Sequence, residues 1–122
     1  MPKNHHNCVW MHLRSEDELA ILYKILHAFN VNLKVYDIVY KKTSTMEYHP
    51  IAYLRPPEFT DDMPLRRPIA MRKWDRIKRV MALARKFDQD KFNEELEKNV
   101  RYQQFEDERN EHYRKIYSKT FD

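Results

Sequence analysis

The chain has 122 residues, no glycine, one cysteine and a formal net charge of +4. This length supports one domain at most, with room for a tail. Phosphate-cradling loops and dinucleotide fingerprints depend on glycine, so its absence argues against the usual nucleotide enzymes. A single cysteine excludes an internal disulfide framework and a multi-cysteine zinc site. No apolar run reaches the roughly 20 residues that span a bilayer.

Residues 1–14 are expected to form an N-terminal arm that is polar over residues 1–9. The first ten residues resemble neither a signal peptide nor a transit peptide. A targeting signal is therefore internal or already removed, or the protein is made where it works. His5 and His6 could catch a metal ion, but adjacent histidines without a third ligand are a weak pattern. We expect no metal site and no cofactor.

Residues 15–29 carry the clearest helical pattern. Ser15 followed three residues later by Glu18 is a capping box, and the acids between them suit the positive end of the helix dipole. The apolar residues recur at helical spacing on one face: Leu19, Leu22, Tyr23, Leu26 and Phe29. Since this helix carries little positive charge, we expect it to be a packing partner for a second, basic helix.

The basic helix lies in residues 64–86, which hold nine Lys or Arg and one acid, a local charge of +8 between weakly acidic flanks. On a helix with Pro68 in its first turn, the apolar residues form one stripe: Ala70, Trp74, Ile77, Met81 and Ala84. The cations lie opposite this stripe and at its borders. Because Arg forms paired bonds to phosphate oxygens, this face predicts binding to a nucleic-acid backbone. A solubilising face is the alternative.

The segment between these helices, about residues 33–68, is expected to be a long connector. Residues 33–40 are β-branched and aromatic and predict a short strand, or else the end of a longer first helix. Five prolines between residues 49 and 68 make regular helix unlikely there. A connector of this length in so small a domain is best explained if it lies against a surface supplied by a larger body.

Residues 88–122 are expected to form a C-terminal extension that is helical over 88–117. Its apolar residues are sparse and drift around the helix axis, so it is either a solvated arm or a helix that docks on another protein through its aromatics. Nowhere in the chain do an acid, a base and an orienting group form a recognisable catalytic pattern. We therefore expect a protein that is not an enzyme and has no small-molecule substrate.

Two segments carry a family resemblance. The first contains Leu13-Arg14-Ser15, Glu18-Leu19, Leu22-Tyr23, Leu26 and Leu33, and the second contains Arg72-Lys73, Arg76-Ile77-Lys78 and Val80-Met81. In this order they resemble the mitochondrial branch of the large-subunit ribosomal protein 29 family. The likeness covers little more than a third of the chain. It departs from the family in its Leu-Tyr pair in place of Leu-Trp, in its long connector, and in everything after residue 88.

The resemblance implies a mainly α fold, an antiparallel two-helix hairpin over residues 15–87. It also implies a structural constituent of the mitochondrial large ribosomal subunit, in the matrix, bound to rRNA and neighbouring proteins near the peptide exit tunnel. The expected RNA-binding residues are Arg66, Arg67, Arg72, Lys73, Arg76, Lys78, Arg79, Arg85 and Lys86. The expected hairpin seam is Leu19, Leu22, Tyr23, Leu26, Phe29, Trp74, Ile77 and Met81.

A looser likeness gives an alternative function. Tyr36-Asp37, Leu54-Arg55-Pro56 and Arg76-Ile77-Lys78-Arg79 are similar to segments of the small, non-catalytic, matrix-side helical subunit of respiratory ubiquinol–cytochrome c reductase. Both readings place the chain inside a large hetero-complex, and neither requires it to span a membrane.

Overall fold

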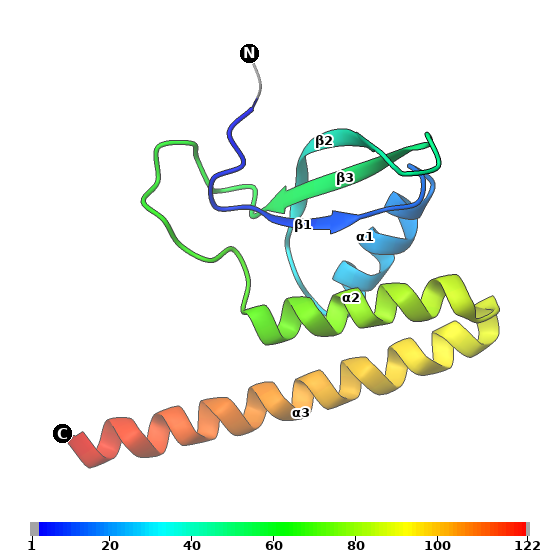
Figure 1. Ribbon diagram of the computed structural model, residues 1–122. Helices are drawn as coiled ribbons and strands as arrows, with labels where there is room; N and C mark the ends of the chain where they lie inside the picture. The colour runs from blue at the N-terminus through cyan, green and yellow to red at the C-terminus, as the bar shows by residue number, and fades with distance from the viewer. Residues whose placement is uncertain (1–2, 122) are drawn as a thin grey trace.

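The computed structural model describes residues 3–121, with side chains described as far as Tyr117 (Figure 1). The elements follow in the order β1 (Val9–His12), α1 (Glu18–Ala28), β2 (Lys34–Lys42), β3 (Tyr48–Arg55), α2 (Met71–Lys86) and α3 (Gln89–Phe121). The strands form one antiparallel sheet with β3 in the middle, in the order β1-β3-β2. Helices α1 and α2 cover one face of this sheet, and α3 runs antiparallel along the side of α2 away from it.

The mainly α hairpin expected for residues 15–87 is wrong, because a three-stranded sheet makes this a mixed α/β fold. The first helix and the basic helix do pack together, but two sheet strands separate them in the chain. The helical hairpin that does exist joins α2 to α3 through a short turn at Phe87 and Asp88. The extension after residue 88 is therefore part of the helical layer over its first half.

The connector expected over residues 33–68 contains the two longest strands. Residues 33–40 lie mostly in β2, so the strand alternative for this segment is correct. The central strand β3 was missed because it contains Pro50, although its buried residues alternate at Pro50, Ala52 and Leu54 as a half-buried strand requires. The Pro50 carbonyl accepts a hydrogen bond from the Leu13 N–H at 2.9 Å, just beyond the end of β1. In an antiparallel strand the N–H and C=O of one residue point to the same side. The N–H that Pro50 lacks would therefore face Leu13, so its absence removes no hydrogen bond between β3 and β2.

The turns are made without glycine. The loop between β2 and β3 closes with Thr43 N–H donating to the Glu47 carbonyl at 2.7 Å, and Met46 takes a left-handed φ of 67°. Asn7 and Asn30 have φ values of 62° and 56°, and asparagine tolerates this region better than most residues. Asn30 directly follows the C-cap of α1 and turns the chain toward β2.

Both helix starts differ from expectation. The N-cap of α1 is Asp17 without a side-chain cap bond, so the capping box at Ser15 is wrong. The Glu18 carboxylate does bond backward, but to the Arg14 N–H at 2.6 Å. Helix α2 begins at Met71, not at Pro68, because Ala70 at its N-cap is still extended.

One apolar core joins the sheet to the helices. Its fully buried side chains come from the sheet, α1, α2 and the residue after β1: Leu13, Leu22, Ile25, Leu26, Leu54, Trp74, Ile77, Val80 and Met81. Phe92 and Leu96 of α3 complete it beneath α2. Removing one such side chain from water contributes about 1.5–3 kcal/mol. Helix α2 is thus held between the sheet layer and α3.

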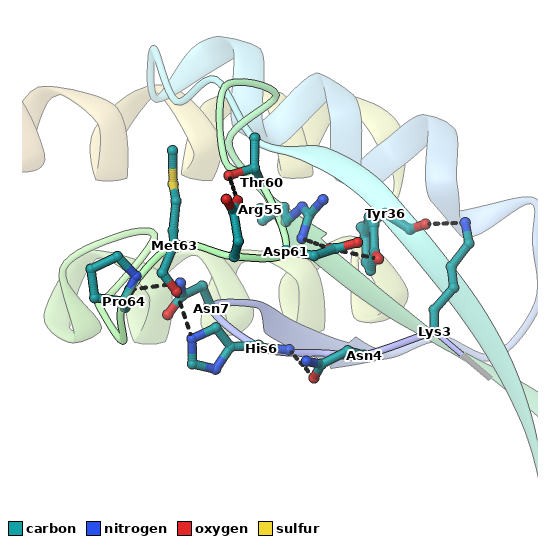
Figure 2. Close-up of polar contacts among 11 residues, drawn as sticks. Lys3, Asn4, His6, Asn7, Tyr36, Arg55, Thr60, Asp61, Met63 and Pro64 are labelled. Carbon is teal, nitrogen blue, oxygen red and sulfur yellow. Dashed lines mark hydrogen bonds and ion pairs between the residues drawn. The ribbon is translucent and has the colours of Figure 1, made fainter. Parts of the chain in front are cut away.

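The N-terminal arm and the segment from Pro56 to Ala70 are tied to each other (Figure 2). The Asn7 side chain donates to the Pro64 carbonyl at 3.0 Å and accepts from the Arg66 N–H at 2.8 Å. His6 reaches the Met63 carbonyl at 3.1 Å. Asp61 accepts from Arg55 at 2.7 Å and from the Tyr36 hydroxyl at 2.9 Å. The segment therefore lies against a surface that the chain itself supplies.

Candidate nucleic-acid interface

The nine predicted RNA-binding cations, seven of which lie on α2, fall into two groups. Four of them contact carboxylates from α1 or α3: Arg72, Lys73, Arg76 and Arg85. The other five carry no ion pair to another element among the described residues: Arg66, Arg67, Lys78, Arg79 and Lys86. The expected continuous cationic face is therefore interrupted by acids of the same chain.

Arg76 makes the innermost of these contacts. Its guanidinium lies 2.8 Å from Glu106 of α3, and the two side chains are 12% and 7% exposed. It also donates to the Gln103 side-chain oxygen and lies 4.7 Å from the centre of the Tyr102 ring. The hydrogen bond from Arg76 lowers the pKa of Glu106. Arg76 thus holds α3 to α2 and is not available to phosphate.

Arg85 does the same between α2 and α1. Its Nε lies 2.8 Å from Glu18 Oε2, and its Nη2 donates to Glu18 Oε1 at 2.9 Å. Burial disfavours the charged form of Glu18, but the bonds from Arg85 and the Arg14 N–H outweigh it, so the pKa of Glu18 is lowered. Such a fork-to-fork pair is geometrically specific. Arg85 is therefore a structural residue.

The other two contacts are weaker. Lys73 lies 3.8 Å from Asp107, and Arg72 lies 3.5 Å from Glu106 while its side chain stays 84% exposed. Exposed pairs of this kind contribute at most about 1 kcal/mol. Arg72 can therefore still face an external anion.

Three of the remaining cations line one groove. It has a volume of about 700 Å³ and lies between β1, the N-terminal half of α2 and residues 65–68. Arg66, Arg67 and Lys78 line it together with apolar side chains. The Arg66 guanidinium lies 4.9 Å from the centre of the Phe59 ring, which holds the arginine without neutralising it. The groove thus combines an apolar floor with positive charge.

Trp10 gives this groove an exposed aromatic wall. Its side chain is 57% exposed, whereas Trp74, which also lines the groove, is 2% exposed and belongs to the core. Leu65 and Met71 add exposed apolar surface at 83% and 41%. A tryptophan beside arginines is the combination that stacks bases and holds phosphates in single-stranded nucleic-acid sites.

Trp10 is the site residue that sequence reasoning missed as a functional group. The signal was present, because Val9, Met11 and Leu13 alternate with Trp10 and His12, and strict alternation indicates a half-buried strand with one outward face. The edge position of β1 in the sheet leaves this tryptophan beside the groove.

Arg79 and Lys86 lie further along the exposed side of α2. Arg79 donates to the Asp75 carbonyl at 3.4 Å, and Lys78 lies 3.5 Å from the Asp75 carboxylate. Lys86 lies 5.7 Å from the centre of the Phe87 ring. These residues extend the positive surface beyond the groove but do not line it with the aromatic residues.

The predicted seam residues do come together, although not in a hairpin. Leu22, Leu26, Phe29, Trp74, Ile77 and Met81 are buried, and Leu19 and Tyr23 are half-buried. The Tyr23 hydroxyl accepts a hydrogen bond from the Val35 N–H at 3.0 Å and so fixes the start of β2 against α1. The seam is one part of a core shared with the sheet.

Three histidines pair with an aspartate or with each other. His5 lies 2.7 Å from Asp37 and stacks on Tyr53 with ring centres 3.6 Å apart. His12 lies 3.2 Å from His49. Within residues 3–121 no three His, Cys, Asp or Glu side chains come close enough to hold a metal ion.

None of the helices in the described part of the chain has the length and apolar character that a membrane crossing requires. Comparison with protein-family models, with curated proteins and with solved structures finds no match to this chain.

Proposed function

We propose that this protein is a non-catalytic RNA-binding subunit of a large ribonucleoprotein. The observation that carries the proposal is the groove in which Trp10 faces Arg66, Arg67 and Lys78, with no carboxylate among its lining residues. On α2, carboxylates of the same chain pair with Arg72, Arg76 and Arg85. At the groove, where an exposed tryptophan also lies, Arg66 and Arg67 have no carboxylate partner among the described residues, and Lys78 pairs with Asp75 of its own helix.

The groove favours single-stranded RNA over a duplex. A base can stack on Trp10 while the flanking phosphates bind the two arginines and the lysine. An A-form duplex offers phosphates and 2′-hydroxyls but no unstacked base. The exposed Arg72, Arg79 and Lys86 then bind phosphate outside the groove and add affinity without sequence preference.

The mitochondrial large ribosomal subunit is the particle that the sequence motifs suggest, with rRNA and neighbouring ribosomal proteins as partners in the matrix. The helical hairpin of that family is not the fold of this chain, so this narrower assignment has the sequence motifs alone as support. A component of a large particle also accounts for the many exposed aromatic residues, which suit docking to neighbouring proteins.

Fluorescence titration with single-stranded oligouridylate tests the groove. Stacking on Trp10 should quench the exposed tryptophan and leave Trp74 unchanged, and Trp10→Phe should abolish the quench. Affinity should fall with salt, with a logarithmic slope of about −2 if three phosphates are bound. An RNA duplex should bind more weakly and without quenching.

Charge reversal provides the matched control. Arg66→Glu with Arg67→Glu should abolish binding, whereas Lys98→Glu with Arg101→Glu makes the same change in net charge on the exposed surface of α3 and should leave it intact. Equal losses in the two variants would mean that only net charge matters, and the groove would then not be the site.

Sedimentation of the tagged protein from cells identifies the particle. Migration with the large ribosomal subunit, lost in the groove variant, is the expected result. Migration with detergent-solubilised inner-membrane complexes would instead favour the respiratory alternative and overturn the ribosomal one.

A further inference from the structure

The C-terminal half of α3 leaves the body of the protein. Buried residues in this helix end at Glu106, and residues 107–117 are all exposed. Residues 107–121 extend roughly 22 Å at about 1.5 Å per residue, and Figure 1 shows this end of α3 passing beyond the start of α2. We call residues 107–121 the helical arm. A helix of this length is marginal by itself in water, so a partner would stabilise it.

The surface of the arm carries an aromatic stripe that continues from the body. Tyr102, Phe105, Tyr113 and Tyr117 are 54%, 60%, 51% and 62% exposed. At 100° per residue these positions fall within about a third of the helix circumference. Arg109 lies in the same stripe, 6.0 Å from the centre of the Phe105 ring. Contiguous exposed aromatic surface of this kind marks an interaction site.

The charges along the arm are ordered. Glu106 and Asp107 pair with cations of α2. Beyond them, residues 108–111 carry two acids and one arginine, and residues 112–117 carry Arg114 and Lys115 with no acid. The exposed surface of the arm therefore changes from net negative to net positive along its length, and Glu111 and Lys115 lie 3.7 Å apart where the two parts meet. Two copies in parallel would place like charges together, whereas two antiparallel copies place each acidic half against a basic half.

We propose that the helical arm binds a second copy of the chain as an antiparallel helix pair. The register that sets Phe105 of one copy beside residues 116–117 of the other also brings Glu108 opposite Lys115 at the flank of the stripe. The twofold symmetry of such a pair makes this contact twice. Arg109 then lies near Tyr113 of the second copy, where a cation–π contact is favourable.

The charge order makes the proposal testable by exchange of two residues. Sedimentation equilibrium of the nuclease-treated full chain should show a dimer. Glu108→Lys or Lys115→Glu should each weaken dimerisation by about tenfold, because each places like charges together at both symmetric contacts. The double variant, E108K with K115E, restores opposite charges and should recover the wild-type dissociation constant.

Lys98→Glu is the matched control, since Lys98 is 69% exposed on α3 outside the arm and pairs with Glu95 of the same helix. It should leave dimerisation unchanged. A wild-type chain that stays monomeric at its highest soluble concentration would overturn the proposal. So would single variants with wild-type dimerisation, or a double variant no better than the singles. Circular dichroism of each variant confirms that the helix content is retained. The affinity of each variant for RNA is measured in parallel. The dimer proposal and the RNA-binding proposal can therefore be refuted independently of each other.

Discussion

Arg85 and Glu18 lie 67 positions apart in the chain and are joined by two hydrogen bonds, of 2.8 and 2.9 Å. The same guanidinium donates to the His12 carbonyl at 3.0 Å, at the end of the edge strand. One arginine of α2 therefore fixes the first turn of α1 and the end of β1 together. It was expected to bind RNA, and its role here is to hold the layers.

Replacing Arg85 with Ala should destabilise the protein by about 3 kcal/mol, since it leaves the Glu18 carboxylate largely buried without its cation. The measurement is chemical denaturation followed by circular dichroism. Lys86→Ala removes the neighbouring exposed cation and should change the stability by less than about 0.5 kcal/mol. Similar losses in both variants would contradict the structural role of Arg85.

Replacing Arg76 with Ala should loosen α3. The Arg76 side chain joins Glu106 and Gln103 to α2. Without it, both polar groups lose a hydrogen-bond partner in a partly buried interface. Hydrogen exchange should become faster in residues 99–107 and stay unchanged in β3. Binding of oligouridylate by the folded variant should not fall, because Arg76 is outside the groove. A lower affinity for oligouridylate without faster hydrogen exchange in α3 would mean that Arg76 contacts RNA and does not hold α3.

Lowering the pH should reduce the stability of the folded protein. Glu18 and Glu106 have a lower pKa in the folded protein than the value of about 4.3 found in unfolded chains. Their ionised forms therefore add stability that is fully present above that value and is lost as the pH falls through the folded-state pKa. The melting temperature should be nearly constant from pH 7 to about 5 and then drop.

A variant carrying Glu18→Gln and Glu106→Gln provides the comparison. It should be less stable at neutral pH and should lose less of its remaining stability on acidification. A residual slope is expected from Asp37, Asp61 and Asp62, whose pKa values are also lowered by side-chain hydrogen bonds. An unchanged slope would mean that the two glutamates do not stabilise the fold through their charge.

Replacing Trp74 should reduce stability, whereas replacing Trp10 should affect RNA binding. Trp74→Ala opens a cavity at a site that is 2% exposed and should cost about 3–5 kcal/mol. Trp10→Ala should change stability by less than about 1 kcal/mol, because its ring is mostly in solvent, but should remove the quenching by oligouridylate. Thermal melts and titrations on the same two samples separate the roles.

Local patterns predicted the helices well and their partners poorly. The stripe of Trp74, Ile77 and Met81 is buried as its spacing indicated, because a helix with one apolar face must cover it. The carboxylates that pair with Arg76 and Arg85 could not be predicted, because Glu106 and Glu18 are distant from them in the sequence.

The sheet was missed for a different reason. Pairing along β3 depends on partners at residues 9–12 and 34–42, and no short window contains both. A proline usually argues against a strand, but Pro50 lies opposite the residue just beyond the end of β1 and interrupts no ladder bond, so the alternation of Pro50, Ala52 and Leu54 is that of a strand. The outward position of Trp10 followed from that pairing, so the groove could not be predicted without the sheet.

The attachment of α3 to α2 has a consequence for how strongly the chain attracts polyanions. While the helices stay together, Lys73 and Arg76 are masked by Asp107 and Glu106. Detaching α3 would unmask both residues beside Arg72, which is already exposed on the same side of α2. The positive local electric field would then strengthen without any change in sequence. The chain should therefore bind a polyanion more strongly when α3 is detached, although α3 does not line the groove.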